Sequence, residues 1–169
     1  MATKEIIKVK VKDGIPEICY WNIYEDGNKG ESIAKDPYLI HKDFQEAIDA
    51  LRPHFALLCD LREADIIKKK IHQHHEEAFT HIRISGITIS GTGDDQGVCI
   101  VGSKSYRSKV LPMTTPFEKF FDDYSDYRFK EELHSAIQLV QYEAEEYLNG
   151  KYRVQQMKMD FESHAEDME

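Results

Sequence analysis

Four of the chain's eight histidines lie in the segment 71–81, IHQHHEEAFTH, whose residue types and spacing come closest to a chemical site. On a helix, His72, His75 and Glu76 would occupy positions i, i+3 and i+4, close enough for their side chains to share a metal ion. The order is HxxHE, however, whereas a zinc protease places its general base in the order HExxH. Three consecutive lysines at 68–70 would also repel a cation. A solvated polar helix is therefore favoured, and a metal-dependent hydrolase built on these three residues is the alternative.

Two other segments contain residue types that bind phosphates or bases. The glycine-rich stretch 91–97, GTGDDQG, lacks the Lys-Ser/Thr ending of a P-loop and precedes a strand pattern, so we expect a hairpin tip. The segment KSYRSK combines cations with an aromatic ring in Lys104, Tyr106, Arg107 and Lys109. These four residues could contact a nucleic-acid backbone or a nucleotide and stack on one base. Exposed loops between strands often have the same composition.

Covalent catalysis finds no support in the sequence, and no cofactor is implied. Cys19, Cys59 and Cys99 form no CxxC pair and have apolar neighbours, which predicts buried thiols rather than a disulfide framework or zinc ligands. A GxSxG nucleophile elbow is also absent. We therefore expect a protein that is not an enzyme.

The composition is typical of one soluble domain, with 169 residues of which 41% are hydrophobic and 31% charged. No apolar run approaches the roughly 20 residues that span a bilayer, so we expect a cytoplasmic protein without a membrane partner. The formal net charge of −9 argues against a broad contact with nucleic-acid phosphates. From Phe117 onward the chain has fourteen Asp/Glu against six Lys/Arg, so the acidity belongs mainly to the C-terminal third.

The elements that would position these residues form two successive units of hairpin plus helix. In the first unit, alternation and turn residues predict strands at 6–12, 15–24 and 32–34. A helix with Phe44, Ala47, Ile48 and Leu51 on one face follows, and Pro53 must kink or restart it.

The second unit repeats this plan after an insertion at about 61–80. Strands are predicted at 81–90, 98–101 and 109–113, with a bulge at Ser85-Gly86. A disordered-looking acidic stretch then precedes a helix at 129–148, whose apolar spacing is the clearest in the chain.

These elements predict an α+β fold, in which a largely antiparallel sheet of two hairpin-plus-helix units is backed by two main helices. Residues 1–150 would form one domain, and 151–169 would form a C-terminal tail. The expected core residues are Phe44, Ile48, Leu51, Leu133, Ile137 and Val140.

The stretch ITISGTGDDQGVCIVGSK at 87–104, followed by VLPMTTPF at 110–117 and the helix at 129–148, resembles small phage or prophage proteins of gut bacteria. The resemblance covers about the last 90 residues well and the first 60 in outline. Such proteins have no established activity, but they are often encoded among phage replication and recombination genes. The resemblance therefore implies a role near DNA metabolism or host takeover in the bacterial cytoplasm.

The tail contains a segment that looks like the six-residue peptide by which bacterial proteins bind the replication sliding clamp. In this interpretation Gln156 fills the glutamine subsite, Met157 and Met159 take the aliphatic positions, and Phe161 fills the terminal pocket. The same apolar residues could instead pack on their own domain, as an added edge strand would.

We therefore expect a non-enzymatic, phage-derived binding protein that acts at the host replication machinery, with the sliding clamp or another host protein as partner. The alternative is an anti-defence protein that sequesters a nucleotide signal or inhibits a host effector. A homodimer is compatible with the sequence because the predicted sheet has edge strands.

Overall fold

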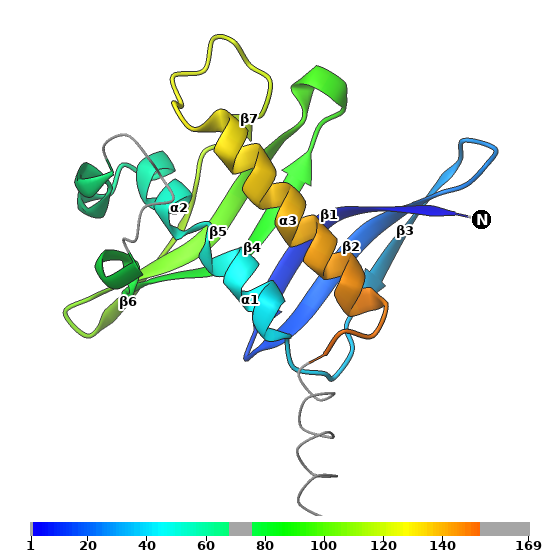
Figure 1. Ribbon diagram of the computed structural model, residues 1–169, viewed down its shortest axis with the longest axis horizontal. Helices are drawn as coiled ribbons and strands as arrows, with labels where there is room; N and C mark the ends of the chain where they lie inside the picture. The colour runs from blue at the N-terminus through cyan, green and yellow to red at the C-terminus, as the bar shows by residue number, and fades with distance from the viewer. Residues whose placement is uncertain (1, 68–75, 153–169) are drawn as a thin grey trace, which may run out of the picture.

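The computed structural model of the chain describes residues 2–67 and 76–152, which form an antiparallel sheet with helices on one face (Figure 1). Along the sheet the strands are ordered β3-β2-β1-β4-β5-β6, and the short β7 pairs with β5. The strands are β1 (Thr3–Lys12), β2 (Ile15–Ile23), β3 (Lys29–Ala34), β4 (Ile82–Ser90), β5 (Gly97–Tyr106), β6 (Lys109–Thr114) and β7 (Glu118–Lys119). This architecture confirms the predicted α+β class.

The hairpin turns and one bulge follow from local residue choice. Asp13 and Gly14 both have positive φ, at 54° and 78°, which matches the twist needed between β1 and β2. The predicted bulge lies in β4, where the pairing register with β5 shifts between Ile84 and Gly86. A Cβ at Gly86 would lie 2.4 Å from the carbonyl oxygen of Val9, so glycine there permits β1 and β4 to approach each other.

Three α-helices cover one face of the sheet: α1 (Lys42–Asp49), α2 (Arg52–Leu58) and α3 (Lys130–Leu148) (Figure 1). Pro53 lies at the start of α2 and separates it from α1, because proline fits the first turn of a helix but not its interior. All six predicted core residues are confirmed, with exposed fractions of 0–1%: Phe44, Ile48, Leu51, Leu133, Ile137 and Val140. Among the described residues, no helix is both long and apolar enough to cross a membrane.

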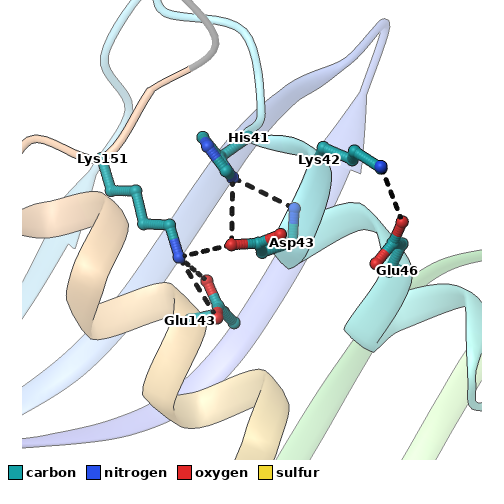
Figure 2. Close-up of polar contacts among 6 residues, drawn as sticks. All are labelled: His41, Lys42, Asp43, Glu46, Glu143 and Lys151. Carbon is teal, nitrogen blue, oxygen red and sulfur yellow. Dashed lines mark hydrogen bonds and ion pairs between the residues drawn. The ribbon is translucent and has the colours of Figure 1, made fainter. Parts of the chain in front are cut away.

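Contacts with the domain continue beyond residue 150, to the last described residue. Tyr152 stacks on Tyr38 with ring centroids 4.4 Å apart and forms an isolated antiparallel bridge with Ile40. Lys151 lies 2.9 Å from Asp43 at the start of α1 and 3.2 Å from Glu143 on α3, as Figure 2 shows. The hydrogen bond from Lys151 lowers the pKa of the Asp43 carboxyl. The C-terminal end of α3 is therefore tied to the start of α1 by charge-assisted contacts.

Candidate functional site

Several residues singled out by sequence lie outside the described part of the chain. These are the tail residues Gln156, Met157, Met159 and Phe161 and the histidines His72 and His75. Glu76 begins a short 3-10 helix, Glu76–Phe79, but its side chain is also outside the described set. Within residues 2–67 and 76–152, no group of three or more His, Cys, Asp or Glu side chains could hold a metal ion.

The four residues predicted to contact nucleic acid do not lie together in one site. Tyr106, Arg107 and Lys109 lie at the turn between β5 and β6, where the Arg107 guanidinium lies 5.1 Å from the centre of the half-exposed Tyr106 ring. Lys104 instead forms an ion pair with Glu63, with Nζ 2.7 Å from Oε1. The amine of Lys104 is therefore engaged in a different contact from the three residues at the turn.

The Lys104 contact is part of a three-residue cluster that joins β5 and His81, the residue before β4, to the 3-10 helix Arg62–Ile66. His81 Nε2 lies 2.9 Å from the same oxygen of Glu63. Burial raises the pKa of the Glu63 carboxyl, but hydrogen bonds from Lys104 and His81 outweigh burial and lower the pKa to about 2. This cluster holds the segment after α2 against the sheet.

The thiols are less uniformly buried than the sequence predicts. Cys19 is buried, whereas Cys59 and Cys99 are half-buried. Burial raises the pKa of all three thiols, which makes them poor nucleophiles at neutral pH.

The cleft with the most varied chemistry lies between the end of α2 and the connector 116–127 that leads from β6 to α3. Its volume is about 540 Å³. Apolar side chains form one part of the wall, namely Leu57, Leu58, Pro116 and Phe117. The remaining lining is polar and consists of Glu118, Lys119, Asp122, Ser125, Asp126 and Tyr127. The acidic stretch that looks disordered in the sequence is thus part of a defined site.

A buried histidine contacts Tyr127, one of the residues that line the cleft. His54 on α2 is 1% exposed, and its Nδ1 lies 2.5 Å from the hydroxyl oxygen of Tyr127. Burial raises the pKa of the Tyr127 phenol, and the charges of Glu118 and Glu132 raise it further. Because the phenol keeps its proton, its O–H can donate to the imidazole and fix the orientation of the tyrosine ring.

The connector is attached to the sheet at its start and to the hydrophobic core at its end. At its start, buried Thr115 exchanges two hydrogen bonds with the backbone of Ile100, at 2.8 and 2.9 Å. Strand β7 then pairs with β5, and a Cβ at Gly97 would lie only 2.3 Å from the carbonyl oxygen of Glu118. At its end, Phe129 is buried at the entry to α3. Glycine at position 97 is therefore what lets β7 approach the sheet.

Aromatic rings are exposed on the connector, at the cleft and beyond it. Phe117 is 42% exposed, Phe121 51% and Tyr124 95%, while Phe120 between them is buried against His134. An exposed set of rings on one short segment is unusual for a surface with no partner. These rings can interact with cations through their faces as well as with apolar groups.

The charge of the cleft is negative. It has three carboxylates, on Glu118, Asp122 and Asp126, and one lysine. That lysine, Lys119, lies 3.1 Å from Asp95, so its charge is already compensated from outside the cleft lining. The arrangement therefore attracts cations, and the apolar wall adds a surface for their aliphatic stems.

Comparisons with protein-family models, with curated proteins and with solved structures found no match for this chain. The site is accordingly defined by its geometry and its charge.

Proposed function

We propose that this protein is a non-enzymatic binding protein whose cleft receives a basic segment of a protein partner. The observation that carries this proposal is the combination, in one cleft, of three carboxylates with an apolar wall that includes the exposed ring of Phe117. The exposed rings of Phe121 and Tyr124 lie on the same connector. Arginine and lysine side chains match this lining, because their charged ends pair with carboxylates and their stems pack on rings and aliphatic groups.

Several features of the cleft favour binding over catalysis. Two of its side chains are held by hydrogen bonds: Ser125 donates a hydrogen bond to Glu118, and Tyr127 is paired with His54. The raised pKa of the phenol opposes its use as a nucleophile or as a base at neutral pH. These contacts orient side chains without leaving an activated group at the surface.

The direct test is the binding of short fluorescent peptides to the full chain. The first peptide would alternate arginine with leucine. The second and third peptides would have the same length, with each arginine replaced by glutamine in the second and by glutamate in the third. Anisotropy titrations should give binding of the arginine peptide that weakens as salt increases, and little binding of the other two. Equal binding of the arginine and glutamine peptides would contradict the proposal.

Matched variants separate the cleft from the overall negative charge. Glu118→Gln with Asp126→Asn removes two charges from the cleft, while Glu46→Gln with Glu145→Gln removes two exposed charges from α1 and α3. The cleft variant should bind the arginine peptide about tenfold or more weakly than the parent protein, since two carboxylate contacts are lost. If both variants weaken binding equally, the attraction is due to net charge rather than to this cleft.

The expectation from sequence that the partner is the host sliding clamp remains a separate proposal, as does the phage origin. Its peptide, Gln156 to Phe161, lies outside the described residues, and the described chain before it ends at Tyr152, held on Tyr38 and Ile40. The test is a titration of the clamp against the full chain and against a chain truncated after Tyr152. Equal clamp binding by the two forms, or binding by neither, would reject the tail as a clamp ligand.

A further inference from the structure

The face of the sheet opposite the three helices has an ordered distribution of charge on β1, β2 and β3. The pairing registers place Glu5 beside Trp21 and Trp21 beside Glu31, in one row across the three strands. The next row contains Lys8, Cys19 and Ile33, and the row after it pairs Lys10 with Glu17. The side chains of all these residues point away from the core, because their neighbours Val9, Ile18 and Tyr20 belong to the core face.

The two ends of this face have opposite charge. Glu5 and Glu31 lie at one end, and the other end has a hollow of about 300 Å³ lined in part by Lys10, Lys12 and Lys35. Three residues do not follow the pattern. Asp13 and Glu17 line the same hollow as the lysines, with Glu17 directly opposite Lys10 on the neighbouring strand, and Lys29 lies at the outer end of β3.

The middle of the face is mostly apolar or small, apart from the exposed Lys8 beside Cys19. Trp21 is half-buried between its neighbours, and Ile33 is 63% exposed, which is unusual for isoleucine at the surface of a sheet. Cys19 between them is buried. On β4 and β5 most side chains of this face are short, namely Thr88, Ser90, Cys99, Val101 and Ser103. The exception is Arg83, which is exposed opposite Ser103 toward the lysine end of the face. Short side chains permit another sheet to approach at the usual distance of about 10 Å.

We propose that this face is the interface with a second copy of the chain. A two-fold axis that lies between the two sheets and runs across the strands places the acidic end of one copy over the lysine end of the other. Glu5 and Glu31 of each protomer then face the hollow that contains Lys10, Lys12 and Lys35 of its partner. Each contact between the two ends occurs twice, as an isologous interface requires.

The available area fits a stable dimer. Six paired strands, at a spacing of about 4.8 Å and a rise of about 3.3 Å per residue, present a face of roughly 800 Å². A standard stable interface buries about 800 Å² on each partner. The apolar centre supplies the desolvated contact, and the charged ends determine the orientation of the two copies.

Charge reversal tests this arrangement with the full chain. One variant reverses the acidic end, Glu5→Lys with Glu31→Lys, and another reverses the lysine end, Lys10→Glu with Lys12→Glu. Each variant alone has like charge at both ends and should dimerise at least about tenfold more weakly than the parent protein. Mixed in equal amounts, the two variants have opposite faces and should form a heterodimer. A control, Lys42→Glu with Glu46→Lys, exchanges an exposed ion pair on α1 and should dimerise like the parent.

The measurement is the mass in solution by sedimentation velocity, between about 1 and 200 µM, a range in which interfaces of this size can dissociate. Circular dichroism of each variant shows that it is folded. A parent chain that stays monomeric throughout this range would overturn the proposal. Reversed variants that dimerise as well as the parent, or a folded mixture that remains monomeric, would also overturn it.

Discussion

Replacing Tyr127 with phenylalanine tests whether the contact behind the cleft is a structural support. The substitution keeps the aromatic ring and removes only the hydroxyl that lies 2.5 Å from Nδ1 of His54. His54 is 1% exposed, so its imidazole has little access to water that could replace the lost hydroxyl. The change therefore isolates one buried hydrogen bond between residues far apart in the chain.

The magnitude follows from burial. A typical intramolecular hydrogen bond contributes about 0.5–1.5 kcal/mol, and a buried polar atom left without its partner costs about 1–3 kcal/mol. We expect Tyr127→Phe to lower the free energy of unfolding by about 1–3 kcal/mol. For a domain of 169 residues this corresponds to a fall in Tm of about 2–4 °C per kcal/mol.

Urea unfolding at pH 7 measures the change, with Tyr142→Phe as the control because Tyr142 is 56% exposed on α3. A double-mutant cycle with His54→Phe then gives the coupling energy between the two side chains. If Tyr127→Phe changes the free energy of unfolding by less than about 0.3 kcal/mol, or if the cycle shows no coupling, the role assigned to this contact is refuted.

Three further predictions concern the elements that hold the site and the core. Gly97→Ala should displace β7, because a Cβ there would lie 2.3 Å from the Glu118 carbonyl oxygen, and arginine-peptide binding should fall as a result. The control Gly30→Ala, whose Cβ would make only ordinary contacts with Tyr24, should leave binding unchanged. The free energy of unfolding should decrease as the pH falls from about 4.5 toward 2, because the pKa of Glu63 is lowered to about 2 in the folded protein. In Glu63→Gln, this pH-dependent loss, measured by urea unfolding, should be smaller by roughly 1–3 kcal/mol. Leu133→Ala on α3, where leucine is fully buried, should lower the free energy of unfolding by about 2–5 kcal/mol, and a smaller loss would mean that the core repacks.

The strands and helices were predictable because their signals are local. Alternation of β-branched residues predicted β1 to β6, although β3 and β5 are longer than predicted and β7 was not predicted. Apolar spacing predicted α3 to within a residue of its bounds, Lys130–Leu148. Proline chemistry predicted the break that separates α1 from α2 at Pro53. In each of these cases the residues that determine the element lie within the element itself.

The cleft was not predictable because its contacts are not local. His54 and Tyr127 are 73 residues apart, and neither has a pattern that marks it as a partner of the other. The connector 116–127 has no period of 2 or 3.6, so its acidic composition was interpreted as disorder. Gly97 was the only local signal, and a single glycine before a strand does not show which backbone approaches it. The cleft therefore depends on tertiary contacts that local patterns do not encode.

The placement of negative charge in the connector bears on what the cleft is for. Glu118, Asp122 and Asp126 line the same cleft, together with Lys119. The contacts at Thr115, β7 and Phe129 hold the connector in place, so these carboxylates are presented on a fixed segment. A basic ligand that pairs with several of these carboxylates would link residues of the connector to one another, and it should therefore stabilise the connector as it binds. A purely structural connector would gain nothing from this concentration of charge, whereas a binding surface for a basic segment would gain both attraction and orientation from it.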